Sequence, residues 1–260
     1  MCRVIAISSN KGGVGKTTTA VNLGIGLARN GKRVLLIDVD AQADLSKSLG
    51  IRNPSGLEYT LTEVLQSIAD NEDIDPKAGI IRHDEGVDLM PGSINLVALD
   101  TTLSNYKNGD SVLWKYIEML RDEYDYILID SKPALVKLSV NVLAAADSVI
   151  IPVLAEYLPI SNIEPTILSV RLVKRRLNHK LEVEGFVFTM FDKRTTLAKE
   201  SVTAVKNAYA DHVKIFDSII PRANSLAKAP AFGESIYKFD PRGKGAEAYE
   251  ALTLEVLANE

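Results

Sequence analysis

The chain has 260 residues, of which 46% are hydrophobic and 25% charged, and its formal net charge is −4, a composition that excludes a disordered protein. The lone cysteine, Cys2, excludes a disulfide framework and a multi-cysteine metal or iron–sulfur site within the chain. No apolar run approaches the roughly 20 residues that span a bilayer, and loop residues follow residues 1–9 directly, so we expect neither a membrane span nor a signal peptide.

Short apolar runs rich in Val and Ile alternate along the chain with longer segments of helical pattern. The runs lack polar alternation, which is typical of strands buried on both faces. Strands are predicted at residues 4–7, 34–39, 126–129, 148–153 and 185–189. Helices are predicted at residues 17–30, 60–69, 111–121, 136–145, 163–177, 197–210 and 246–257. This alternation predicts an α/β fold of three layers, in which helices cover both faces of a mostly parallel, twisted sheet.

Residues 50–110 have the least regular pattern and are expected to form peripheral helices and loops. Because no repeat, low-complexity segment or linker divides the chain, residues 1–260 are predicted to form a single domain. Residues 171–245 carry 15 Lys/Arg and 8 Asp/Glu, against the acidic balance of the whole chain. This asymmetry indicates an anionic partner for one face, or else a solvated basic surface.

A glycine-rich loop, residues 8–15 (SSNKGGVG), separates the first predicted strand from the first predicted helix. Glycines let backbone N–H groups turn inward, and the helix N-terminus adds positive potential, so this loop is predicted to bind phosphate. Lys16 would reach the β and γ phosphates of a nucleotide, and the hydroxyl of Thr17 would bind Mg²⁺. The sequence fits the variant KGGVGKT at residues 11–17, whereas the general GxxxxGK[ST] pattern fails and leaves Lys11 without a role.

Carboxylates follow two of the predicted strands. Asp130 ends the apolar run YDYILID, and it is placed to complete the Mg²⁺ shell directly or through water, although it could instead cap the next turn. Asp38 and Asp40 lie at the carboxyl end of the strand at residues 34–39, where ligands bind in open parallel sheets. One of these two acids could orient an attacking water molecule.

These motifs together resemble the ParA/Soj partition ATPases of the deviant Walker A class, which also includes MinD. The resemblance covers essentially the whole chain. It is carried by KGGVGKTT (11–18), VLLIDVDAQADLS (34–46), YDYILIDSKPAL (124–135), LAAADSVIIPVLAEYLPI (143–160), EGFVFTMFDKRT (184–195) and IPRANSLAKAPAFGESIYKFDPRGKGAEAYEAL (220–252).

The resemblance implies a weak ATPase that uses ATP and Mg²⁺ and serves plasmid or chromosome partitioning. Two copies would form a sandwich dimer around ATP, and this homodimer would bind DNA without sequence preference. A ParB-type centromere-binding partner would stimulate hydrolysis and reset the dimer. The protein would then be cytoplasmic and nucleoid-associated, with no membrane partner.

The resemblance also implies a role for each matching residue. Lys11, Lys16 and Asp40 would be catalytic: Lys11 would cross to the phosphates of the other subunit, and Asp40 would position the hydrolytic water. Thr17 and Asp130 would hold Mg²⁺. The implied nucleotide-binding set is Lys11, Gly12, Gly13, Val14, Gly15, Lys16, Thr17, Thr18, Met190 and Pro221, the last two beside the adenine. The implied DNA contacts are Arg194 and Arg222.

The chain departs from the family pattern at four positions. Ala41 and Ala43 stand where the family has proline and glycine, which changes the backbone freedom of this loop. Asp44 and Lys132 add opposite charges near the phosphate region and could form an ion pair. We expect these changes to retune hydrolysis and partner response, with ATP binding retained.

Other functions remain open from the sequence. A nucleotide-gated dimeric scaffold with negligible hydrolysis would also fit the altered motifs. A MinD-like positioning ATPase would need a basic amphipathic terminal helix, whereas residues 246–260 are acidic. An operator-reading role would need a helix-turn-helix domain before the nucleotide loop, and none is expected because that loop starts by residue 10. The basic segment RLVKRRLNHK (171–180) is interpreted as a solvated helix end.

Overall fold

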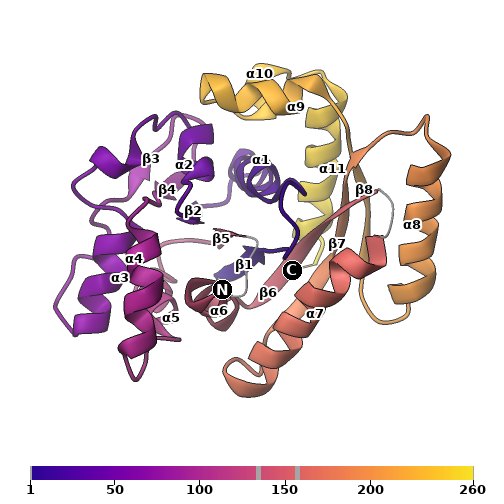
Figure 1. The fold of residues 1–260 in the computed structure, drawn as a ribbon. Coiled ribbons are helices and arrows are strands. Elements are labelled where there is room, and N and C mark those ends of the chain that lie inside the picture. Colours follow the sequence, from indigo (N-terminus) through magenta and orange to yellow (C-terminus); the bar gives the residue numbers. More distant parts are fainter. Residues whose placement is uncertain (1, 133–135, 156–158, 260) are drawn as a thin grey trace.

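The computed structural model describes residues 2–132, 136–155 and 159–259, so residues 133–135 and 156–158 of two family-like segments lie outside the described residues. Within the described chain, eight strands form one sheet in the order β3-β4-β2-β5-β1-β6-β7-β8 (Figure 1). Neighbouring strands are parallel except for the antiparallel pair β3–β4. The strands are β1 Arg3–Ile7, β2 Val34–Val39, β3 Ile81–Arg82, β4 Asp88–Met90, β5 Tyr126–Ser131, β6 Ser148–Leu154, β7 Glu182–Phe191 and β8 Ile215–Pro221.

Helices cover both faces of this sheet, as predicted (Figure 1). The first face carries α1 Lys16–Arg29, α2 Asp44–Ser48, α10 Ile236–Phe239 and α11 Lys244–Leu257, with the short α9 Asn224–Lys228 beside them. The second face carries α3 Leu61–Asp70, α4 Leu96–Thr102, α5 Val112–Glu118, α6 Lys137–Ala145, α7 Pro159–Arg176 and α8 Thr196–Tyr209. Single 3₁₀ turns lie at Pro54–Gly56, Leu103–Asn105 and Ala229–Phe232.

Two separate hydrophobic cores result from the alternation of side chains along the central strands. In β2, Leu35 and Ile37 enter the core beneath α3–α8, whereas Val34 and Leu36 enter the core beneath α1 and α11. All six residues of β2 are buried. The continuous apolar run was therefore correctly interpreted as a strand that is covered on both faces.

The five predicted strands and seven predicted helices are all present, with ends that shift by a few residues. Helix α5 ends three residues earlier than predicted, and α7 starts earlier and contains Pro165. The sequence missed the two edge strands β3 and β8, and also β4, which lies between β3 and β2. Strand β8 contains the polar pair Asp217 and Ser218 and alternates in burial, because an outer strand packs on fewer neighbours. Within the described residues, no helix is both long and apolar enough to cross a membrane.

Helices α1 and α11 approach closely at Gly26. A methyl group at this position would meet the hydroxyls of Thr253 and Tyr237, both of which are held in the core. A methyl group at Gly24, two residues earlier on the same helix, would meet the ends of two leucine side chains, Leu36 closely and Leu128 in ordinary contact. The position of α1, which begins at the phosphate loop, therefore depends on a side-chain-free contact with α11.

We predict that Gly26→Ala lowers the free energy of unfolding by about 1–3 kcal/mol, because overpacking outweighs the better helix propensity of alanine. Gly24→Ala is the matched control and should have a smaller effect, since Leu36 can move. Chemical denaturation of both variants measures the difference. An unchanged stability of Gly26→Ala would show that the two helices are not in close contact.

Candidate functional site

The glycine-rich loop connects β1 to α1 at the carboxyl edge of the sheet. Gly13 and Gly15 have φ angles of 71° and 84°, a left-handed backbone that favours glycine. The helix begins directly after them, since the N–H of Thr19 donates to the carbonyl of Gly15 at 2.9 Å. The unpaired N–H groups of the first helical turn thus lie beside the loop, which is the arrangement that binds phosphate.

Two neighbouring elements hold this loop in place. The hydroxyl of Thr189, near the end of β7, donates to the carbonyl of Val14 at 2.8 Å. The N–H of Asn10 donates to the hydroxyl of Thr166 on α7 at 2.9 Å. Sequence reasoning missed both threonines. Thr189 was detectable in principle, because it falls at the end of a predicted strand on the edge that carries the loop.

Lys16 is buried beneath the loop, with 8% of its surface exposed. Its Nζ donates to the carbonyl oxygen of Lys11 at 3.3 Å, so the side chain curls back across the loop. Burial lowers the pKa of Lys16, while the charges of Asp130 and Asp40 act in the opposite direction. Gly12 and Gly13 are exposed and Lys11 is partly exposed, so this side of the loop faces solvent.

Thr17 and Asp130 meet at the start of α1 and the end of β5. The hydroxyl of Thr17 donates to Oδ2 of Asp130 at 2.6 Å. Burial, reinforced by the nearby charge of Asp38, raises the pKa of Asp130 to about 8. Its second oxygen, Oδ1, is buried and has no hydrogen-bond partner within the described residues. A hydroxyl and a carboxylate are the hard oxygen ligands that Mg²⁺ prefers, and the unpaired oxygen suits a metal-bound water. The two residues therefore fit the predicted Mg²⁺ site.

The two acids after β2 differ in surroundings. Asp38 is fully buried and accepts hydrogen bonds from the N–H and hydroxyl of Ser46 at 2.8 and 2.6 Å. Strand β2 ends at Val39, so Asp40 lies outside the strand, and it is only partly buried. The charge of Asp40 acts on both Lys16 and Asp130. Asp38 thus shapes the loop after β2, and Asp40 is the acid that could orient water.

The loop between Asp40 and α2 contains a strained residue. Ala43 has φ 51° and ψ 40°, a left-handed conformation that costs a non-glycine residue roughly 1–2 kcal/mol. This is the position at which the resemblance predicts glycine. Asp44 lies 3.9 Å from Lys47, and among the described residues no ion pair joins it to Lys132. The suggested Asp44–Lys132 pair is therefore not formed.

A pocket of about 350 Å³ lies beside the loop, between the ends of β7 and β8, α9 and α11. Met190 and Pro221 both line it, together with Gly15 and Thr18 of the loop. Met190 has a φ of 51°, which turns the chain sharply at the pocket wall. Tyr249 of α11 also lines the pocket, and sequence reasoning missed it. The pocket is mostly apolar in its lining and continuous with the phosphate loop, so it suits a nucleobase.

Arg194 and Arg222 lie near each other at the ends of β7 and β8. The N–H of Arg222 donates to the carbonyl of Phe191 at 3.0 Å, which joins the two strand ends. Arg194 is 84% exposed and forms a two-pronged ion pair with Asp192, at 2.9 and 2.7 Å. This contact holds the pKa of Asp192 well below its usual range. Both arginines are exposed, but the structure adds an acid beside them that the sequence analysis did not consider.

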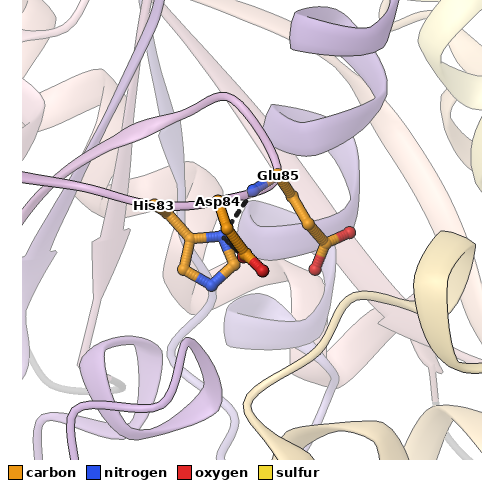
Figure 2. A group of neighbouring side chains, drawn as sticks. All are labelled: His83, Asp84 and Glu85. Carbon is orange, nitrogen blue, oxygen red and sulfur yellow. Dashed lines mark hydrogen bonds and ion pairs between the residues drawn. The ribbon is translucent and has the colours of Figure 1, made fainter.

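A cluster of potential metal ligands, His83, Asp84 and Glu85, lies in the turn before β4 (Figure 2). Its side chains already form hydrogen bonds and ion pairs with other residues of the chain. Nδ1 of His83 accepts from the N–H of Glu85 at 3.2 Å, and Asp84 pairs with Lys238 at 2.9 Å. The carboxylate of Glu85 accepts from the N–H and hydroxyl of Ser235, which caps α10. The cluster therefore anchors α10 to this turn.

The chain is similar in sequence and in structure to known proteins along nearly its whole length. Residues 2–183 match the model of a family described as an AAA domain. The chain is 41% identical to the sporulation initiation inhibitor protein Soj of Bacillus subtilis, over 100% of both chains. It is 37% identical to the chromosome-partitioning ATPase Soj of Thermus thermophilus, over 98% of this chain and 96% of the relative. Among solved structures, it is similar to cobyrinic acid a,c-diamide synthase from Mycobacterium smegmatis with bound ATP analog and magnesium, with a TM-score of 0.86 and 32% identity over 99% of this chain and 94% of that one.

We predict that Ser46→Ala lowers the free energy of unfolding by about 1.5–3 kcal/mol, because it removes a hydrogen bond to a buried carboxylate. Ser139→Ala is the matched control, since the hydroxyl of Ser139 is buried without a hydrogen-bond partner among the described residues. This control should be close to neutral. Equal losses in urea denaturation would show that the Asp38 contact contributes no more than an unpaired buried hydroxyl.

Proposed function

The chain belongs to the ParA/Soj family of partition ATPases, and on that basis we propose that ATP joins two copies of it into a sandwich dimer that binds DNA. As a member of this family it is a ParA-like partitioning ATPase that uses ATP and Mg²⁺. The Thermus relative is named as an ATPase, which favours hydrolysis over a purely scaffolding role.

The asymmetric burial of the phosphate loop carries the dimer proposal. Lys16, Thr17 and Asp130 are gathered inside one subunit, beneath and beside the loop. Gly12 and Gly13, on the other side, are exposed and leave room for a second protein surface. Lys11 begins this exposed side and is itself partly exposed, which supports a role for its side chain at a nucleotide that the other subunit holds.

Each residue then acts through its chemistry. Lys16 neutralises the β and γ phosphates, and Thr17 and Asp130 hold Mg²⁺, Asp130 directly or through water. A bound Mg²⁺ would supply positive charge that stabilises the phosphoryl group during its transfer. Asp40 orients the attacking water, and Lys11 adds positive charge from the facing subunit. Met190 and Pro221 enclose the adenine in the pocket beside Gly15 and Thr18.

The DNA-binding part of the proposal rests on the exposed arginines at the ends of β7 and β8. Arg194 and Arg222 would contact phosphates, which gives binding without sequence preference and with strong salt dependence. Asp192 competes with the phosphate for Arg194, because the two already form an ion pair. A ParB-type partner would stimulate hydrolysis, and DNA binding would place the protein on the nucleoid.

The proposal treats residues 1–260 as one ATPase domain. Strand β1, near the start of the chain, is central in the sheet, and α11, near its end, packs on the same sheet against α1. Both ends of the chain thus contribute to one core, which supports a single unit.

We predict that Lys11→Ala abolishes the ATP-dependent dimer and lowers hydrolysis while nucleotide affinity of the monomer changes little. Lys16→Ala, the comparison variant, should lose nucleotide binding itself, because its Nζ lies inside the site. Light scattering with ATP, ADP and no nucleotide reports the dimer, and ADP titration reports the affinity. Equal loss of dimer, hydrolysis and affinity in Lys11→Ala would place the lysine in the site of its own subunit and contradict the proposal.

We predict that Arg194→Ala and Arg222→Ala each weaken DNA binding uniformly across sequences and reduce the salt slope by about 1. Asp192→Asn should strengthen binding, because it releases Arg194. Arg52→Ala serves as the control, because Arg52 is exposed and belongs to neither β7 nor β8 nor the segments that follow them. Fluorescence anisotropy with unrelated duplexes over a salt series measures these effects. Unchanged binding by the double arginine variant would remove this surface from the DNA interface.

A further inference from the structure

Helices α5, α6 and α7 run side by side on the second face of the sheet (Figure 1). Two adjoining hollows lie beside them. Their volumes are about 480 and 270 Å³, and both are lined by Asp110 and Leu177. We call the two hollows together the α5–α7 groove. The proposed ATPase function uses neither of them.

The groove exposes large apolar side chains. Trp114 of α5 is 45% exposed, and Leu177, just after α7, is 46% exposed. Leu172, one helical turn before the end of α7, is 36% exposed and lines the smaller hollow. A tryptophan and two leucines around one depression form the kind of apolar surface that marks a binding site when polar residues surround it.

The rim of the groove is positively charged. Arg176 lines the smaller hollow, and Lys180 lines the larger one. In the part of the chain that the structure describes, Arg176 and Lys180 form no ion pair, whereas the neighbouring Lys174 pairs with Glu182. The one acid in the lining, Asp110, is neutralised by Lys137 at 2.7 Å. The groove therefore presents uncompensated positive charge around an apolar floor.

This surface is separate from the arginines assigned to DNA. The groove residues His179 and Lys180 directly precede β7, and Asp192 and Arg194 directly follow it. Ten residues of strand span roughly 30 Å, so the two basic regions lie at opposite ends of the sheet. The basic segment 171–180 is thus more than a solvated helix end, because part of it forms the wall of an apolar groove.

We propose that the α5–α7 groove is a docking site for an acidic segment of another protein that carries bulky apolar side chains. The acidic side chains of such a segment would meet Arg176 and Lys180, and its apolar side chains would fill the hollows beside Trp114 and Leu177. A concave site encloses individual side chains, whereas a bilayer presents a broad surface, so the shape favours a peptide segment over a membrane.

The test uses Trp114, which is the sole tryptophan of the chain, as the reporter. A random peptide library displayed on phage is selected against the full-length protein, and the enriched peptides are synthesised. We expect acidic peptides with bulky apolar residues, which shift the emission of Trp114 to the blue on binding. Arg176→Glu and Lys180→Glu should each weaken this binding about tenfold or more, equivalent to about 1.4 kcal/mol.

Arg175→Glu is the matched control, because Arg175 is exposed on the same helix and lines neither hollow. It should weaken binding less than threefold. Circular dichroism checks that all three variants remain folded. Enriched peptides that are not acidic, an unchanged Trp114 emission, or equal losses in Arg175→Glu and Arg176→Glu would overturn the proposal. A blue shift produced by phosphatidylglycerol vesicles, but by no selected peptide, would overturn it in favour of a membrane surface.

Discussion

Two carboxylates are buried side by side at the ends of neighbouring inner strands of the sheet, and the nucleotide site depends on this constraint. Asp38 and Asp130 occupy paired positions at the ends of β2 and β5, and both are almost completely buried. Burial raises the pKa of both, so each needs compensation by nearby donors or cations. Ser46 supplies donors to Asp38, and Thr17 and Lys16 face Asp130. A Mg²⁺ ion would complete that compensation.

This arrangement links the site to the loop between β2 and α2. Asp38 holds Ser46, and between them lies the loop with Asp40 and the strained Ala43. A change at the phosphates that moves Asp40 is therefore transmitted to α2 over only a few residues. The backbone strain at Ala43 favours rearrangement of this loop, because another conformation would relieve it. Glycine at the same position would not be strained. Under the proposed function, in which ATP joins two copies and hydrolysis separates them, such a loop would suit the change between the two states.

Positive charge gathers in two separate regions of the molecule, and the two proposals assign a different partner to each. The phosphate loop concentrates N–H groups and Lys16 at the carboxyl edge of the sheet, and Arg194 and Arg222 extend this positive region along the same edge. The groove at Arg176 and Lys180 lies at the other end of β7. The net charge of the whole chain is nevertheless negative, because acidic residues outnumber basic ones outside these two basic regions.

The central strands, the long helices and the residues of the phosphate loop could all be predicted from the order of the amino acids. These features are local: an apolar run buried on both faces and a KGGVGKT loop before a helix need no knowledge of distant contacts. The folded structure was needed to show which of Asp38 and Asp40 is buried, that Asp192 pairs with Arg194, and that Thr166 and Thr189 hold the loop. It also decided the edge strands and the α5–α7 groove. In each of these cases the partners are far apart in the chain or depend on where a strand ends, and packing between elements, which no local pattern encodes, brings them together.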